Sequence, residues 1–171
     1  MANAASPTRH LVLLGLGSNL GGRAGNLRHA LGCLEREHGA MIERVSSWFE
    51  TEPVGGPPQG MYLNGAAVIV TAESAQDLLG SLHSVEAGLG RRRTVPNAPR
   101  PIDLDILLYD DVVMNGPELA IPHACMLERA FVLEPAAEVA PEWVHPVTGR
   151  TIEAHWRELR AAVESSRKDF P

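Results

Sequence analysis

Two aspartates in one short stretch of the chain have the types and spacing needed to hold a metal ion. Asp103 and Asp105 stand two residues apart in the string P-R-P-I-D-L-D-I-L-L-Y-D-D, which runs from residue 99 to residue 111. In a strand, residues two apart point to the same face. Two carboxylates at that spacing repel each other unless a cation lies between them, and hard divalent cations such as Mg²⁺ bind oxygen ligands of this kind.

Arginines stand close to the aspartate pair. Arg100 lies three residues before Asp103, and Arg91, Arg92 and Arg93 lie shortly before it. Carboxylates, a metal ion and arginines together suit a polyphosphate, because phosphoryl-type transfer is catalysed mostly by positioning and charge neutralisation. Taken alone, a D-x-D in a strand is more often a pair of solvated aspartates, and an arginine run is more often a solvated surface.

The aspartate pair lies within a predicted strand. Apolar residues occupy every second position from Ile102 to Leu108, and this alternation predicts a half-buried strand with one wholly apolar face. Other runs of strand-forming residues predict further strands earlier in the chain. Apolar positions that recur every three or four residues predict helices between them. Strands are expected over residues 11–17, 41–51, 62–71 and 102–109, and helices over residues 26–37 and 74–89.

Two segments without periodicity separate these elements. Residues 52–60 hold three prolines and three glycines, and residues 91–100 carry four arginines among prolines, so both are loops of the kind that often carry function. After the aspartate strand, Asn115-Gly116 predicts a hairpin over residues 111–119. A short helical stretch around residues 126–130 and a last helix from about residue 152 to residue 163 complete the chain.

The order of the elements predicts an α+β fold. Strand, helix, strand, strand, helix, strand is the ferredoxin-like βαββαβ pattern, an antiparallel sheet with helices on one face, here followed by a C-terminal hairpin and helices. The face left open is where a ligand could lie. The same topology carries RNA-binding modules, regulatory modules and enzymes, so the fold alone does not indicate the chemistry.

Composition limits the class of protein. The 171 residues, 44% of them hydrophobic, suffice for one domain, expected over residues 11–165 between a disordered leader (1–10) and a frayed tail (166–171). The net charge of −6 argues against a nucleic-acid or membrane-surface binder, which would need a basic field. Cys33 and Cys125 have no disulfide-framework or metal spacing, and no segment resembles a signal peptide or membrane span, which predicts a cytoplasmic protein.

Seven strings of the sequence resemble one enzyme family, 6-hydroxymethyl-7,8-dihydropterin pyrophosphokinase. They occur in that family's order and at its approximate spacing, over roughly residues 11–142. The string R-P-I-D-L-D-I is specific enough that chance is a poor explanation. The strings are G-L-G-S-N-L-G from Gly15, S-S-W-F-E-T-E-P from Ser46, Y-L-N-G-A-A-V from Tyr62, E-A-G-L-G-R-R-R from Glu86, A-P-R-P-I-D-L-D-I-L-L-Y from Ala98, I-P-H from Ile121 and E-R-A-F-V-L-E-P from Glu128.

The resemblance implies an ATP-dependent diphosphotransferase of folate biosynthesis. In such an enzyme, pyrophosphate passes from ATP to the hydroxymethyl group of the pterin by Mg²⁺-dependent in-line attack on the β-phosphorus, and AMP is released. ATP and the pterin are then the substrates and two Mg²⁺ ions are the cofactors. The protein is expected to be a cytoplasmic monomer without nucleic-acid or membrane partners.

The resemblance implies roles for individual residues at the positions that match the family. Asp103 and Asp105 are the implied metal ligands, and with Arg91 and Arg100 they are the implied catalytic residues. Contacts to ATP are implied for Glu86, Arg91, Arg93, Arg100, Ile106, His123 and Arg129. Contacts to the pterin are implied for Thr51, Pro53, Val54, Gly55, Tyr62, Asn64 and Phe131, with Tyr62 and Phe131 sandwiching the flat ring.

Three rival functions use parts of the same pattern. A nucleotidyltransferase places its G-S and D-x-D elements close together, whereas Gly17-Ser18 stands 85 residues before Asp103. A haloacid-dehalogenase-type phosphatase carries its D-x-D on an early parallel strand rather than a late antiparallel one. An RNA-binding module of the βαββαβ type needs aromatic residues on its central strands, and residues 11–17 contain none. These differences favour the pyrophosphokinase.

Overall fold

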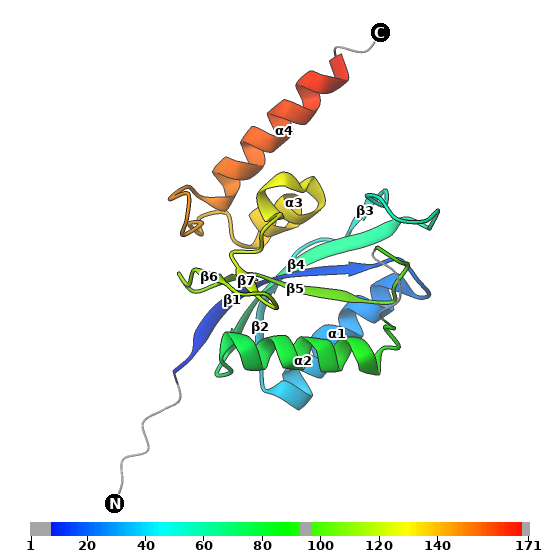
Figure 1. Cartoon of the computed structure of the whole chain (residues 1–171), viewed down its shortest axis with the longest axis vertical. Helices are drawn as coiled ribbons and strands as arrows, with labels where there is room; N and C mark the ends of the chain where they lie inside the picture. Colours follow the sequence, from blue (N-terminus) through cyan, green and yellow to red (C-terminus); the bar gives the residue numbers. More distant parts are fainter. Residues whose placement is uncertain (1–7, 93–96, 169–171) are drawn as a thin grey trace, which may run out of the picture.

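An antiparallel sheet forms the centre of the molecule (Figure 1). The computed structural model describes residues 8–92 and 97–168. The strand order is β2-β4-β1-β5, and β3 continues along the edge of β4 that β2 occupies. The strands are β1 (His10–Ser18), β2 (Met41–Val45), β3 (Phe49–Thr51), β4 (Tyr62–Thr71) and β5 (Asp103–Tyr109).

Two helices, α1 (Arg23–His38) and α2 (Ala75–Gly88), cover one face of the sheet (Figure 1). Local signals set the end of α1 and the start of α2 as the sequence predicts, whereas α1 begins at Arg23, before the expected start at residue 26. Gly39 adopts a left-handed backbone (φ 63°) directly after α1, and the Ser74 hydroxyl accepts a hydrogen bond from the Asp77 main chain at the start of α2. The buried core between these helices and the sheet includes Leu14, Leu16, Leu27, Leu34, Ile69, Leu78, Leu82, Leu104 and Ile106.

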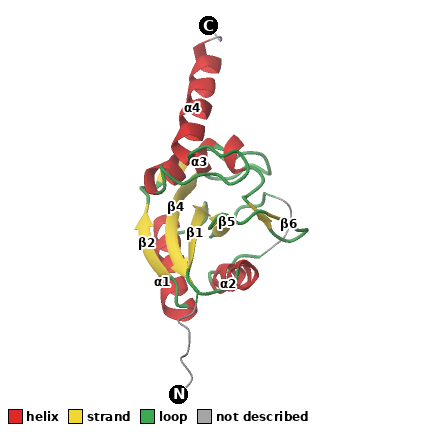
Figure 2. Cartoon of the chain, turned by 90° about the vertical axis from the view of Figure 1, so that its left-hand side faces the viewer, coloured by secondary structure: helices red, strands yellow, loops and turns green. Residues whose placement is uncertain are grey.

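A second helical layer lies on the other face of the sheet (Figure 2). Helix α3 (Ala130–Val139) packs against β4, where Ala66 and Val68 contribute to a second buried cluster, and α4 (Ile152–Lys168) packs against α3. The face that the sequence leaves open is therefore partly covered by α3. The remaining part of that face is available for a cavity.

Helix α3 is longer than the sequence predicts. The short helical stretch expected around residues 126–130 is a 3-10 helix (Met126–Glu128), and α3 follows it after Arg129. Pro135 falls inside α3, and a proline at such a position normally argues against a helix. Burial of the apolar side of α3 against the sheet outweighs this local signal, because most helical stability in proteins comes from tertiary packing.

The single strand expected over residues 41–51 is two strands in the structure, which corrects that prediction. The break begins at Ser46, whose hydroxyl accepts the hydrogen bond from the Ala66 main-chain N–H. It continues to Trp48, whose ring lies against Gly65 of β4. A Cβ atom on Gly65 would lie 2.4 Å from two ring carbons of Trp48, so only glycine lets the ring approach this closely.

Gly65→Ala is therefore expected to destabilise the fold by about 1 to 3 kcal/mol, because added volume in a packed site forces side chains and backbone to shift. Gly80→Ala is the matched control. Gly80 is exposed on α2 with nothing within 4 Å of an added Cβ, so alanine should stabilise the helix there. Chemical denaturation of both variants gives the free energies of unfolding. A Gly65→Ala protein as stable as its parent would show that Trp48 does not restrict this position.

The expected hairpin after β5 is confirmed by the pairing of β6 (Met114–Asn115) with β7 (Ala120–Ile121). Residues 1–7 of the expected leader and residues 169–171 of the expected tail lie outside the described residues, whereas β1 begins at His10 and α4 continues to Lys168. Within residues 8–92 and 97–168, no helix combines the length and apolarity needed to cross a membrane.

Candidate active site

The two aspartates lie opposite glycines of the neighbouring strand. In the pairing of β5 with β1, Asp103 is the partner of Gly17 and Asp105 is the partner of Gly15. Gly17 is also the partner of Asn64 on β4, and a Cβ on Gly17 would lie 3.0 Å from Asn64 Oδ1. Because these glycines have no side chains, the face of β1 between the aspartates and Asn64 stays open.

A cavity of about 380 Å³ lies over this part of the sheet. Its walls come from β1, β4, β5, the loop of residues 52–60 and the start of α3. The structure thus brings together most of the residues that the sequence analysis assigns to the site, although they are far apart in the chain. The assigned residues that line the cavity are Thr51, Val54, Gly55, Tyr62, Asn64, Arg100, Asp103, Asp105, His123, Arg129 and Phe131.

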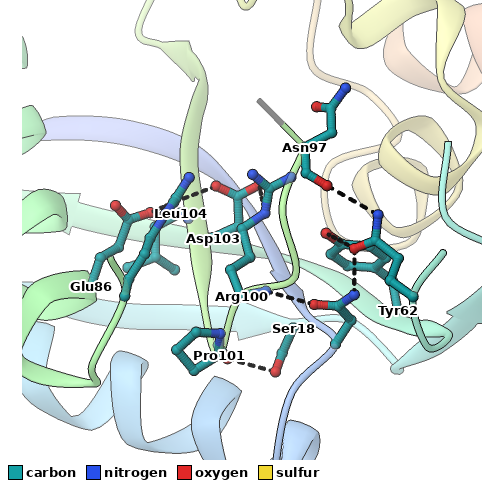
Figure 3. A network of polar contacts seen from close by, with 11 residues as sticks. Ser18, Tyr62, Glu86, Asn97, Arg100, Pro101, Asp103 and Leu104 are labelled. Atoms are coloured by element: carbon teal, nitrogen blue, oxygen red, sulfur yellow. Dashed lines mark hydrogen bonds and ion pairs between the residues drawn. The ribbon is translucent and has the colours of Figure 1, made fainter. Parts of the chain in front are cut away.

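Asp103 has an arginine beside each carboxylate oxygen. Arg91 Nη1 donates to Asp103 Oδ1 at 2.5 Å, and Arg100 Nε lies 3.2 Å from Asp103 Oδ2, as the labelled Arg100 and Asp103 in Figure 3 illustrate. The contact with Arg100 is an ion pair without hydrogen-bond geometry, and Arg100 Nε is a buried donor without a hydrogen-bond partner among the described residues. A buried donor beside a cavity is well placed for an anionic acceptor.

Asp105 lies in a setting that disfavours its negative charge. Burial raises the pKa of the Asp105 carboxyl above its ordinary value, and the charge of Asp103 raises it further. His123, Arg91 and Arg100 act in the opposite direction but do not cancel the rise in this pKa. A cation bound beside the two carboxylates would favour the ionised form of Asp105.

Glu86 connects α2 to β5 next to the aspartates (Figure 3). Its Oε1 accepts hydrogen bonds from the Leu104 main-chain N–H at 2.8 Å and from Arg91 Nη1. Burial raises the pKa of Glu86, although both of these donors lower it. For Arg91, burial lowers the pKa, but the charges of Asp103 and Glu86 outweigh burial and the pKa is raised. Arg91 is therefore a stable cation that ties Glu86 to Asp103.

The cavity also presents aromatic and amide groups. Tyr62 lies at the start of β4 and Phe131 at the start of α3, so the two rings come from different layers. Asn64 Nδ2 donates to Thr51 Oγ1 at 2.6 Å, which leaves the Asn64 oxygen beside Gly17. Such a combination suits a flat ring with polar edges.

Some assigned residues do not line the cavity. The side chain of Ile106 packs in the core under α1 and α2, on the opposite face of β5 from Asp103 and Asp105. Pro53 is half-buried in its loop, and Glu86 and Arg91 reach the cavity through Asp103. Arg93 lies outside the described residues. Among the residues that the structure does describe, no group of three or more His, Cys, Asp and Glu side chains could hold a metal ion.

A family model described as 7,8-dihydro-6-hydroxymethylpterin-pyrophosphokinase (HPPK) matches residues 13–141. The chain belongs to the HPPK family. A 2-amino-4-hydroxy-6-hydroxymethyldihydropteridine pyrophosphokinase of Synechocystis is 41% identical over 143 residues, which cover 84% of this chain and 73% of that protein. The folic acid synthesis protein fol1 of Schizosaccharomyces pombe is 38% identical over 148 residues, 86% of this chain but only 20% of that protein. The predicted pyrophosphokinase activity in folate biosynthesis is thereby confirmed at the level of the family.

Solved structures share the fold. A Plasmodium falciparum HPPK-DHPS chain, solved with pterin and p-hydroxybenzoate, matches with a TM-score of 0.76 over 96% of the present chain and 44% of that chain. The present chain therefore spans less than half of that solved protein. Because sequence identity is 15%, this likeness concerns the fold, and it confirms the predicted α+β class.

The cavity of this HPPK family member also contains residues that sequence analysis does not assign. Glycines inside a strand signal a close approach of another backbone or a ligand, and that signal is present in G-L-G from Gly15. Gln59 and Asn97 come from irregular loops, where no periodic pattern marks them. The unassigned lining residues are Gly15, Leu16, Gly17, Glu52, Gln59, Gly65, Asn97, Leu107 and Val132.

Proposed function

We propose that this protein transfers pyrophosphate from ATP to the hydroxymethyl group of 6-hydroxymethyl-7,8-dihydropterin and releases AMP. The observation that carries the proposal is a single cavity lined by two chemically different kinds of group. The charged groups of Asp103 and Arg100 suit a polyphosphate, and the amide of Asn64 and the ring of Phe131 suit a flat polar ring. A monomer is the proposed working unit.

Asp103 and Asp105 are the proposed ligands of two Mg²⁺ ions. Their oxygens are hard donors, and Mg²⁺ at nucleotide sites usually takes one or two carboxylates, with water and substrate phosphates in its other positions. The raised pKa of Asp105 supports the assignment, since burying this carboxylate is less costly with a cation beside it. When bound, Mg²⁺ would neutralise charge on the phosphates.

Arginines are proposed to bind the phosphates. Arg100 Nε is the buried donor without a hydrogen-bond partner in the described part of the chain, and a phosphate oxygen would accept its hydrogen bond. Arg91 Nη1 contacts Asp103 and Glu86 in this structure, and other N–H groups of the same guanidinium are proposed to donate to a phosphate oxygen. His123 and Arg129 line the cavity and are proposed for the nucleotide side. Contacts of ATP with Glu86, Arg93 and Ile106 stay predictions.

In the proposed reaction, the hydroxymethyl oxygen of the pterin attacks the β-phosphorus of ATP in line. A bond forms between these two atoms, and the bond from the β-phosphorus to the oxygen that bridges it to the α-phosphorus breaks. AMP leaves with that oxygen, and the hydroxyl proton is released. If one cavity holds both substrates, as proposed, the attack becomes effectively intramolecular, which removes much of its entropic barrier.

The pterin ring is proposed to lie between Tyr62 and Phe131, with Asn64 and the loop of residues 51–55 at its polar edge. Phe131→Ala is then expected to weaken pterin binding by about 1 to 3 kcal/mol through lost stacking and buried area, with the fold unchanged. Fluorescence titration or calorimetry gives the dissociation constant. Phe131→Tyr keeps a ring of the same size and should bind nearly as the parent does. An unchanged constant in Phe131→Ala would place Phe131 outside the pterin contact.

The nucleotide product distinguishes the proposed reaction from other uses of ATP. Purified protein with Mg²⁺, ATP and 6-hydroxymethyl-7,8-dihydropterin is expected to form AMP and the pterin diphosphate in equal amounts, as followed by chromatography. Omission of the pterin should abolish AMP formation. Release of ADP would indicate single-phosphate transfer, and AMP without pterin would indicate hydrolysis; either result would contradict the proposed function.

A further inference from the structure

A ring of hydrogen bonds holds residues 97–100, the segment that leads into β5 (Figure 3). The Arg100 main-chain N–H donates to Asn19 Oδ1 at 2.8 Å, and the Asn19 main-chain N–H donates to the Arg100 carbonyl at 3.1 Å. Asn19 Nδ2 donates to Gln59 Oε1 at 2.8 Å, and Gln59 Nε2 donates to the Asn97 carbonyl at 3.0 Å. The ring starts at Arg100 and returns to Asn97. We call Asn19 and Gln59 the amide clasp.

The direction of each bond in the amide clasp is set by the main chain. An N–H group can only donate, so the Asn19 side-chain oxygen faces Arg100 and its nitrogen faces Gln59. The Gln59 oxygen then faces Asn19, and its nitrogen faces the Asn97 carbonyl, which can only accept. The two side-chain amides therefore have one consistent orientation. Rotating either amide by half a turn would place a donor against a donor and an acceptor against an acceptor.

Gln59 uses the full hydrogen-bonding capacity of its amide. In addition to the bonds within the ring, Oε1 accepts from the Tyr62 hydroxyl and Nε2 donates to the Gly55 carbonyl, each at 3.4 Å. A primary amide offers two donors and two acceptor positions, and here all have partners. Tyr62 and Gly55 line the cavity, and Asn97 leads to Arg100, so Gln59 links the loop of residues 52–60 and Tyr62 to the segment that carries Arg100.

Residues 97–100 need such external support. They form no helix or strand, Pro99 has no N–H, and Asn97 adopts a left-handed φ of 55°. The segment carries the Arg100 guanidinium, which lies beside Asp103 and 5.8 Å from the centroid of the Tyr62 ring. The place of this guanidinium therefore depends on how firmly the main chain of residues 97–100 is held.

We propose that Gln59 is a positioning residue. Through Asn19 and the Asn97 carbonyl it holds the main chain of residues 97–100, and thereby it aligns the Arg100 guanidinium with the phosphates. The effect on rate rests on the proposed function, whereas the effect on the main chain does not. Two measurements separate them.

The first measurement needs no substrate. Gln59→Met keeps a side chain of similar length and removes the amide, so hydrogen exchange at the Arg100 amide, followed by NMR, is expected to speed up about ten-fold. Gln76→Met is the matched control, because Gln76 is exposed on α2, and it should leave this exchange rate unchanged. If Gln59→Met has the same midpoint of thermal unfolding as the parent protein, the change in exchange is local. Unchanged exchange at Arg100 in Gln59→Met overturns the proposal.

The second measurement is a double-mutant cycle on the transfer reaction. Gln59→Met is expected to lower kcat about a hundred-fold, since a small displacement of a catalytic group can cost that much. In an Arg100→Ala background the same substitution should change kcat by less than about two-fold, because the residue through which Gln59 acts is gone. An undiminished effect in that background would show that Gln59 acts on the pterin directly, and the proposal would be wrong. If the parent forms no AMP with the pterin, the proposed function fails, and the exchange rate at Arg100 still decides whether Gln59 holds the segment.

Discussion

Asp105→Asn is expected to lower the rate of pyrophosphate transfer by about a thousand-fold, because it removes charge that is proposed to act on the transferring phosphates through bound Mg²⁺. Asparagine keeps the size and shape of the side chain, so the loss reports its charge rather than its packing. Asp105 faces the cavity opposite Gly15, where no other side chain of β1 can replace it. Affinity for the pterin, which is proposed to depend on Asn64 and Phe131, should change much less than the rate.

Asp111→Asn is the matched control for this experiment. Asp111 is exposed in the turn after β5, so its substitution makes the same change in net charge away from the cavity. Single-turnover kinetics with MgATP and pterin give the transfer rate, and calorimetry gives the dissociation constant of the pterin. A transfer rate in Asp105→Asn within about three-fold of that in Asp111→Asn would show that Asp105 is not a metal ligand, since loss of a metal ligand lowers the rate far more.

Arg91→Ala is expected to have opposite effects on metal binding and on transfer. Arg91 Nη1 donates a hydrogen bond to Asp103 Oδ1. Removal of the Arg91 side chain should free that oxygen and strengthen binding of Mg²⁺ in the absence of nucleotide. Transfer should nevertheless slow by about a hundred-fold or more, because a positive charge is lost where negative charge develops in the transition state. Equilibrium binding of MgATP should change little if Arg91 contacts the phosphates mainly in the transition state.

Arg92→Ala separates the specific contact from the general loss of positive charge. Arg92 is the next residue in the chain and is exposed, so its substitution changes net charge equally. It should leave the transfer rate and the affinity for Mg²⁺ close to those of the parent. Calorimetry with Mg²⁺ alone, and single-turnover kinetics beside MgATP binding, measure the three quantities. Weaker Mg²⁺ binding in Arg91→Ala would show that Arg91 does not compete with the metal for Asp103.

Local patterns in the sequence determine much of the sheet and the first helical layer. The apolar run of β4 and the alternation of β5 predict the bounds of both strands almost to the residue. Burial on one or both faces of a strand determines which of its positions are apolar. Gly39 and Ser74 set helix ends through their own backbone and side-chain preferences. The alternation in D-L-D also determines, without any tertiary information, that Asp103 and Asp105 share a face.

Other features of the fold depend on contacts between distant segments. The break between β2 and β3 follows from Trp48 lying against Gly65, and α3 forms across Pro135 because it can bury its apolar side on β4. Neither contact has a signal within its own segment. Propensity therefore predicts one strand and only a short helical stretch, and tertiary packing overrides both predictions.

The sequence alone also determines which residue types are available for the site, through the aspartate pair, the arginine loop and the strings shared with the HPPK family. Only the tertiary structure decides their partners. It places Arg91 between Glu86 and Asp103, turns Ile106 into the core, and joins Asn19, Gln59 and Asn97 across three loops. Hydrogen bonds and ion pairs act over about 3 Å in space, whatever the separation in sequence, and irregular loops have no period from which their neighbours could be predicted.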